Sequence, residues 1–235
     1  MSNELPHNPD IECAILFGSH ARGDADPSSD RDICIITRTD DFDQLLKIKK
    51  DASIQFNTPE SDLACFSLHH LKRMADKGSL FLWHLKNEGV VLDSQSNATQ
   101  VILDNLKPFM GYKRELNLYR RLLADIAQQL PREDRSSELD LHVLQVICRN
   151  LSVLLTYQDH QPTFGRNNAF LTAKKIHPHI PITASEYVTL TDWHLVYMRG
   201  CDRPQGRILQ DDVHSHYPKV LSYLNFCEDA FHDEL

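Results

Sequence analysis

The spacing of the apolar residues changes near residue 100, and this change limits the folds that the chain can adopt. Before it, the apolar runs are short and β-branched, which is typical of the central strands of a small sheet. The predicted strands cover residues 13–17, 33–36, 63–66 and 90–92. Predicted helices lie between them, over residues 42–52, 68–76 and 81–87. This order predicts a small mixed sheet with helices packed on it.

After the change, the apolar residues recur every three or four positions, as in amphipathic helices that bury one stripe. This spacing predicts helices over residues 116–130, 144–155 and 213–231. Thr183-Ala184-Ser185-Glu186 has the form of a capping box and begins a further predicted helix, which Gly200 can end. We therefore predict an α+β protein, with a mixed-sheet domain over residues 1–104 and an α-helical bundle over residues 105–235.

The composition is that of an ordinary soluble protein, with 41% hydrophobic and 25% charged residues. A formal net charge of −8 argues against a long basic groove, so we expect no duplex DNA partner, although a local basic patch is compatible with it. The N-terminal residues lack the pattern of a signal peptide, and no apolar run is long enough to span a membrane. We therefore expect a cytoplasmic protein without a membrane partner. The six cysteines form no C-x-x-C pair and are expected to be reduced and mostly buried.

The residues that predict chemistry are two aspartates placed after a Gly-Ser step. The first predicted strand leads into Gly18 and Ser19, and ten residues separate Ser19 from Asp30-Arg31-Asp32. Residues two apart on a strand share a face, so both carboxylates can project to one point. Hard divalent cations prefer such oxygen ligands, with triphosphate oxygens completing the shell. A strand that passes through glycine into a helix presents backbone N–H groups that suit phosphate.

A third carboxylate is expected from a neighbouring strand. Asp62 is the candidate because it directly precedes the apolar run at residues 63–66, although Glu60 lies only two residues earlier. A turn at residues 26–29 is expected to bring the chain round to the first two aspartates. Taken with the Gly-Ser step, the three acids predict a site for Mg²⁺ and nucleotide phosphates.

At these residues the chain resembles the DNA polymerase β-like nucleotidyltransferase superfamily, whose pattern is a strand, Gly-Ser, about ten residues, Asp-x-Asp and a later acid on a strand. The match covers residues 12–92 and is greatest to the minimal nucleotidyltransferases, in Gly18-Ser19-His20-Ala21-Arg22-Gly23 and in residues 87–92. The resemblance implies two Mg²⁺ ions held by Asp30 and Asp32, with Asp62 on one ion and the incoming hydroxyl. Gly18 and Ser19 would bind the triphosphate.

The implied reaction transfers a nucleoside monophosphate, with AMP favoured, from a nucleoside triphosphate such as ATP to an acceptor hydroxyl, and releases pyrophosphate. The resemblance to minimal members indicates a protein or tRNA acceptor, in a toxin-antitoxin or defence setting. Two alternatives stay open: adenylylation of a small molecule such as an aminoglycoside, and a non-catalytic nucleotide-binding partner protein. Retention of all three acids argues against the last.

Other polar residues leave two interpretations open. Arg22 can contact the triphosphate or pair with a neighbouring acid such as Asp24. Arg166 lies in a polar loop and is either a substrate contact or a surface residue. The histidine pairs at residues 177/179 and 214/216 are expected on the surface, because no further ligand lies at metal-binding spacing. The helical half resembles the HEPN bundle in architecture only, since Arg149 is not followed by histidine at the spacing found in HEPN ribonucleases.

Overall fold

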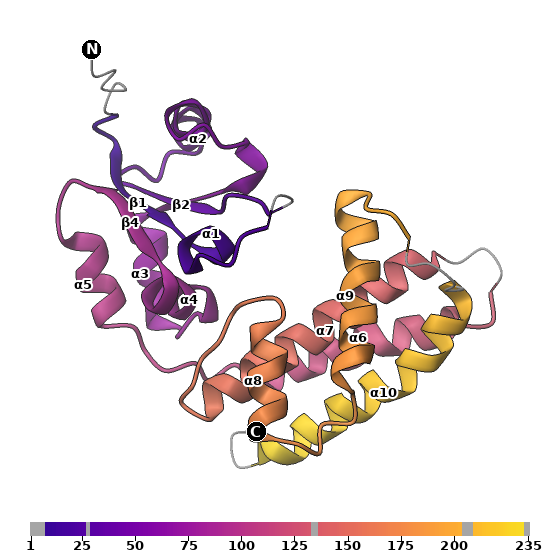
Figure 1. Ribbon diagram of the computed structural model, residues 1–235. Coiled ribbons are helices and arrows are strands. Elements are labelled where there is room, and N and C mark those ends of the chain that lie inside the picture. Colours follow the sequence, from indigo (N-terminus) through magenta and orange to yellow (C-terminus); the bar gives the residue numbers. More distant parts are fainter. Residues whose placement is uncertain (1–7, 27–28, 133–135, 204–208, 233–235) are drawn as a thin grey trace. The chain divides into compact units, whose positions relative to one another are not determined.

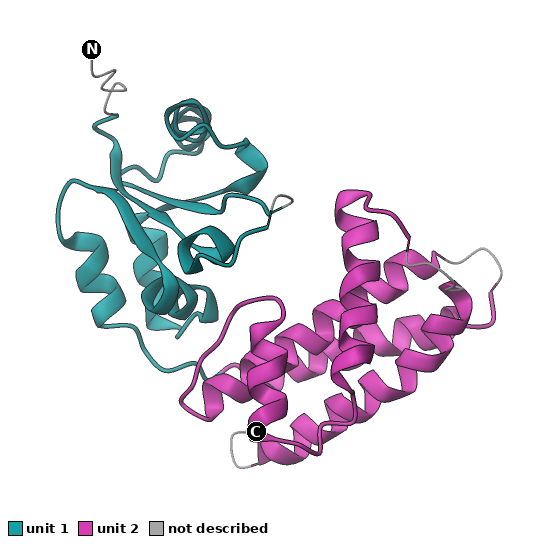
Figure 2. Ribbon diagram, viewed as in Figure 1, with its two compact units in different colours: residues 1–110 teal, residues 111–235 magenta. Residues whose placement is uncertain are grey.

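The computed structural model describes residues 8–26, 29–132, 136–203 and 209–232 (Figure 1). Residues 1–7, on which the search for a signal peptide depended, and residues 27–28 of the expected turn lie outside the described part. The chain divides into two compact units, residues 1–110 and 111–235 (Figure 2). The sequence placed the boundary after residue 104. Residues beyond it pack on the first unit, because Lys107 N donates to Ala75 O at 3.2 Å and Leu106 is buried in that unit's core.

The first unit is built on a four-stranded mixed sheet, as the sequence predicted. Its strand order is β3-β2-β1-β4. The strands are β1 (Ile11–Leu16), β2 (Ile33–Thr37), β3 (Leu63–Ser67) and β4 (Val90–Ser94). Strand β1 lies between β2 and β4 and is antiparallel to both, whereas β2 and β3 are parallel. The sheet and the helices that surround it confirm the α+β class.

Both faces of the sheet are covered by helices. One face packs against α2 (Phe42–Gln55), through Ile48 and Ala52. The other face packs against three helices, α3 (Leu68–Asp76), α4 (Leu80–Glu88) and α5 (Ala98–Asp104). The sequence predicted α2, α3 and α4 but not α5, which is only two turns long. A short five-residue helix, α1 (Gly18–Arg22), follows β1 directly.

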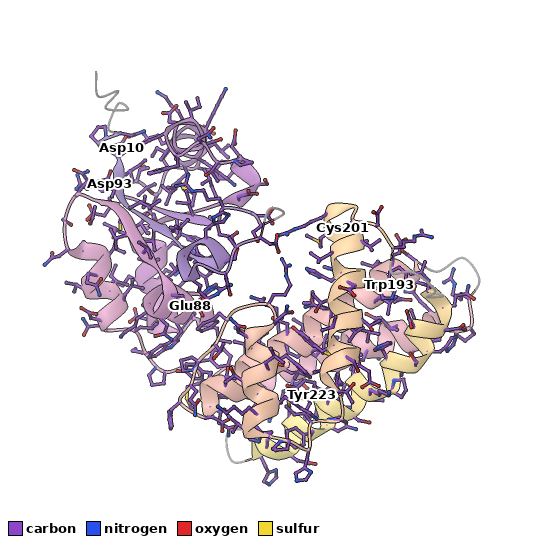
Figure 3. The ribbon with its side chains drawn as sticks, in the orientation of Figure 1. Asp10, Glu88, Asp93, Trp193, Cys201 and Tyr223 are labelled. Atoms are coloured by element: carbon purple, nitrogen blue, oxygen red, sulfur yellow. The ribbon has the colours of Figure 1, made fainter. Side chains whose placement is uncertain are left out.

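The second unit consists of helices in its described residues. They are α6 (Tyr112–Gln129), α7 (Ser137–Gln158), α8 (Asn168–Ile176), α9 (Ala184–Arg199) and α10 (Leu209–Ala230). Helix α7 packs against α8, α9 and α10 and forms the centre of the bundle. Trp193 and Tyr223, labelled in Figure 3, are buried on α9 and α10. The sequence did not predict α8, because two of its three buried residues are alanines, Ala169 and Ala173, which mark an apolar face only weakly.

Helix α7 is long and apolar enough to cross a membrane by length and composition alone, but 67% of its most apolar window is buried inside the protein. That burial is typical of the core helix of a bundle, because a side chain that packs on neighbouring helices is not available to lipid. The buried Ser152 of this helix is hydrogen-bonded within the bundle as well. The Ser152 hydroxyl lies 3.0 Å from the Tyr223 hydroxyl, and it also donates to Cys148 O at 2.7 Å.

The second histidine pair departs from the sequence prediction. His214 is exposed, but His216 is only 4% exposed and its Nδ1 lies 2.7 Å from Asp212 O. Both residues lie on α10, where positions two apart point to different sides of the helix, so one histidine faces the core. His177 is partly buried beside Asp159, with 2.7 Å between Nε2 and Oδ2. The expectation of four surface histidines was therefore wrong for His216.

The capping box that begins α9 is present, with bonds in both directions between Thr183 and Glu186. We expect Thr183→Ala to lower the free energy of unfolding by about 1 kcal/mol, because a backbone N–H of the first turn loses its acceptor. Urea unfolding followed by circular dichroism measures the change. Thr183→Ser is the control, since it keeps the hydroxyl and should lose much less. Equal losses in the two variants would show that the methyl group matters and the cap does not.

Candidate active site

The candidate site lies at one edge of the sheet, where β1 ends and β2 and β3 begin. Leu16 pairs with Ile33 across β1 and β2, and Ile33 pairs with Leu63 across the parallel strands β2 and β3. Asp32 and Asp62 directly precede the paired residues of β2 and β3. Neighbouring strands lie about 4.8 Å apart, so these two residues start side by side at the same edge. This confirms the sequence prediction of a mixed sheet and gives Asp62 a place beside Asp32.

The backbone around Gly18 packs directly against Asp32. Phe17 N donates to Asp32 O at 3.0 Å, which ties the end of β1 to the start of β2. Gly18 has a φ of +72°, and a Cβ added there would lie 2.5 Å from Asp32 Oδ2. A side chain would therefore occupy the position of the carboxylate oxygen. Glycine is required here for backbone conformation and for space.

Local bonds hold the described residues of the segment from Ser19 to Asp30, which are residues 19–26 and 29–30. Gly23, with a φ of +78°, caps the C-terminus of α1, and Asp24 N donates to Ser19 O at 3.1 Å. His20 Nε2 lies 3.3 Å from Ser29 O, next to Asp30. In the described residues no side chain caps α1 at its first turn. Backbone N–H groups at a turn of this kind are suited to an anion.

The three aspartates differ in exposure and in regular structure. Asp30 is exposed, and Asp32 and Asp62 are partly buried. The sequence predicted a strand that begins at residue 33, and β2 does begin at Ile33, so Asp30 and Asp32 lie just before it. Asp62 ends a 3₁₀ turn, Glu60–Asp62, and accepts a hydrogen bond from the Ser61 hydroxyl at 2.7 Å.

Within the described ranges, no three His, Cys, Asp or Glu side chains are arranged as a metal-binding group. The carboxylates of Asp30, Asp32 and Asp62 thus do not form a closed cage in the described residues. Magnesium is usually held by one or two carboxylates together with phosphate oxygens and water, so a closed set of protein ligands is not what this ion requires. The hard oxygen donors of Asp30, Asp32 and Asp62 fit that chemistry.

Arg22 takes part in a network of ion pairs and hydrogen bonds, of which the sequence predicted one partner. Its Nη1 lies 2.7 Å from Glu88 Oε2 and its Nε lies 3.2 Å from Asp24 Oδ2. His84 Nε2 lies 3.0 Å from the same oxygen of Glu88. Pairing with Asp24 was one of the two interpretations left open. Glu88, on α4 and labelled in Figure 3, was not predicted as a partner because 66 residues separate it from Arg22.

Glu88 anchors α1 to α4 through this network. Burial alone would raise the pKa of Glu88, but its hydrogen bonds with His84 and Arg22 outweigh burial and lower the pKa to about 2, from an ordinary 4.5. A carboxyl whose pKa is lowered on folding stabilises the protein above its unfolded pKa and loses that contribution as the pH falls. The affected window therefore runs from pH 4.5 down to 2, with a contribution of about 3 kcal/mol at stake.

We expect Glu88→Gln to be less stable than the wild type at neutral pH and to lose less stability on acidification. The measurement is the free energy of unfolding in urea from about pH 6, above the window set by the lowered carboxyl pKa, to about pH 3, inside that window. Glu60→Gln, at an exposed acid of the same unit, is the control and should follow the wild type. Parallel acid slopes for wild type and Glu88→Gln would contradict the role of this carboxyl.

Comparison with known proteins identifies the first unit. Residues 1–98 match the family described as "Polymerase beta, Nucleotidyltransferase". The chain therefore carries a nucleotidyltransferase domain of the polymerase β family, and the resemblance inferred from Gly18, Ser19 and the aspartates is confirmed.

Two solved structures are similar to this chain at low sequence identity. One is the crystal structure of a toxin-antitoxin with AMP-PNP, at 16% identity and a TM-score of 0.31, covering 52% of this chain and 89% of that one. The other is spectinomycin adenyltransferase AAD(9) from Enterococcus faecialis with ATP and spectinomycin, at 11% identity and a TM-score of 0.44. It covers 90% of this chain and 92% of that one. No curated protein matched the chain.

Proposed function

We propose that the chain is a metal-dependent nucleotidyltransferase that transfers a nucleoside monophosphate, with AMP favoured, to an acceptor hydroxyl on a protein or a tRNA. The family of residues 1–98 supports the reaction type. The observation that carries the site is the packing of the Asp32 carboxylate against Gly18, at the edge where Asp62 directly precedes the neighbouring strand β3. This places an acid beside a turn that presents backbone N–H groups.

The carboxylates at this edge of the sheet suit Mg²⁺, which prefers oxygen ligands. Asp30 and Asp32 would hold two Mg²⁺ ions and Asp62 would hold one of them, because these are the hard oxygen donors that the site offers. When bound, the metal supplies a lowered pKa for the attacking hydroxyl and neutralises charge on the leaving phosphate oxygens.

The protein's own groups position the reactants. The backbone at Gly18 and the Ser19 hydroxyl donate hydrogen bonds to the triphosphate, which needs the close approach that a glycine permits. Asp62 accepts a hydrogen bond from the acceptor hydroxyl and orients its lone pair toward the α-phosphorus. Fixing both partners in this way lowers the entropic part of the barrier. Arg22 keeps its ion pairs with Glu88 and Asp24 and thereby holds α1 against α4.

The test is label transfer from each of the four α-labelled nucleoside triphosphates, with magnesium and with or without cell lysate. Under this proposal, label moves to a macromolecule, and digestion with protease or ribonuclease identifies it as protein or RNA. Transfer only to a small molecule would replace the acceptor proposed here by the aminoglycoside-like alternative. If nucleotide binds but no label is transferred and no pyrophosphate is released, the enzyme proposal is wrong and the chain is a non-catalytic nucleotide-binding partner protein.

A further inference from the structure

Helix α1 is held at both ends by α4, which lies beside it (Figure 1). Phe17 directly precedes the first residue of α1, and its ring packs against the rings of Phe81 and His84 on α4. In the last turn of α1, Arg22 pairs with Glu88 of the same helix. Helix α1 has only five residues, and a helix this short is unstable without support from its neighbours. The contacts with α4 therefore set its position.

The contact at the start of α1 is made by aromatic rings that meet edge to face. The ring centroid of Phe17 lies 5.5 Å from that of Phe81 and 5.4 Å from that of His84, with an interplanar angle of 88° in each pair. Aromatic pairs prefer this geometry at such separations. Phe81 also packs on Phe66 of β3, with 5.6 Å between centroids. The ring contacts therefore fix Phe17 relative to the sheet as well as to α4.

The contact at the end of α1 consists of hydrogen bonds to one carboxylate oxygen. Arg22 Nη1 lies 2.7 Å from Glu88 Oε2, and His84 Nε2 lies 3.0 Å from the same oxygen. The side chains of Arg22 and Glu88 are only 18% and 12% exposed, so solvent screens their attraction little. His84 takes part in both contacts, because its ring packs on Phe17 while its Nε2 bonds to Glu88.

The residues that α4 fixes lie next to the groups of the candidate site. Phe17 N donates to Asp32 O at 3.0 Å. The next residue, Gly18, packs so closely on Asp32 that an added Cβ would lie 2.5 Å from Oδ2. Ser19 follows in the first turn of α1. A movement of Phe17 or of α1 therefore shifts the turn that would bind the triphosphate relative to a carboxylate that would bind the metal.

We propose that His84 is a positioning residue for nucleotidyl transfer, which acts through Phe17 and Glu88 to keep α1 aligned with Asp32. The inference rests on the proposed function, because the position of Gly18 affects a rate only if the triphosphate binds at this turn. Imidazole suits the position, since it offers an aromatic ring to Phe17 and a ring nitrogen to Glu88 at the same time. A phenylalanine offers only the ring, and a glutamine offers only a hydrogen bond.

The experiment compares His84→Phe, His84→Gln and His84→Ala in the full chain. Pyrophosphate release is followed against ATP concentration with magnesium, and with lysate as the source of acceptor, to give an apparent kcat and an apparent KM for ATP. We expect His84→Ala to lose about 100-fold in kcat while KM changes by less than about threefold, because alignment of the turn with Asp32 matters most in the transition state. His84→Phe and His84→Gln each keep one contact and should lose about tenfold in kcat.

Two controls separate positioning from a merely structural role. Ile48→Val removes a methyl group from the core on the opposite face of the sheet, so it should lower the urea midpoint and leave kcat unchanged. His69→Ala changes an exposed histidine on α3 and should match the wild type in both measurements. Circular dichroism establishes that each variant is folded. A His84 variant that only weakened the fold would behave like Ile48→Val.

The inference is overturned if folded His84→Ala keeps its kcat within about twofold of the wild type, or if its loss appears only in KM. If His84→Ala does not fold, the same criteria apply to His84→Phe and His84→Gln, which keep most of the side-chain volume. With an active wild type, either result defeats this inference and leaves the proposed function standing. A wild type that releases no pyrophosphate and transfers no label defeats the proposed function, and this inference with it.

Discussion

Asp30→Asn/Asp32→Asn is expected to lose nucleotidyl transfer by about 1000-fold or more while keeping the fold, because under the proposed function the two carboxylates would hold magnesium and amide groups cannot replace their charge. The metal contribution to such a reaction is worth several kcal/mol, and each 1.36 kcal/mol is a factor of about ten in rate. Asparagine has nearly the same shape as aspartate, so the packing at Gly18 is preserved. Pyrophosphate release under saturating ATP and magnesium measures the loss.

The control for this variant is Asp43→Asn, which changes an exposed acid in the first turn of α2 and should be fully active. Asp62→Asn tests the third acid separately and should also reduce transfer strongly, with nucleotide binding retained. Circular dichroism and the urea midpoint establish that each protein is folded. Activity of Asp30→Asn/Asp32→Asn within about tenfold of the wild type would exclude these residues as the metal ligands.

The second large effect is expected from a single methyl group at Gly18. In Gly18→Ala the new Cβ would lie 2.5 Å from Asp32 Oδ2, so the carboxylate or the turn must move. A shift of about 1 Å in a catalytic group can cost about 100-fold in rate, and we expect a loss of that size. The left-handed backbone at φ +72° adds a loss of stability of about 1 kcal/mol.

Gly23→Ala separates these two effects. Gly23 has nearly the same backbone, with a φ of +78°, but a Cβ there would meet nothing within 4 Å. It should therefore lose stability to a similar extent and keep most of the activity. The two variants are compared by urea unfolding and by the rate of pyrophosphate release. If both lose activity equally, backbone strain in α1 and not the contact with Asp32 limits catalysis.

Local chemistry explains which features were predictable. The β-branched runs that became β1 to β4, the helical period of α6, α7 and α10 and the capping box at Thr183 each depend on residues close together in the chain. The Gly18-Ser19 step and the Asp30-x-Asp32 pair lie within fifteen residues of each other, so their spacing alone predicted a phosphate and metal site. Helices α5 and α8 were not predicted, because their buried faces include Thr99 on α5 and Ala169 and Ala173 on α8, and small or polar residues weaken the apolar period.

The sequence by itself determined the α+β class, the nucleotidyltransferase family of the first unit and the candidate acids. Only the tertiary structure decided that Asp62 lies beside Asp32, since this depends on the parallel register of β2 and β3. It also decided that Glu88 holds Arg22 and that His142 stacks on His194, 52 residues away. Contacts between residues far apart in the chain depend on how helices and strands pack, and no short pattern of residues encodes that packing.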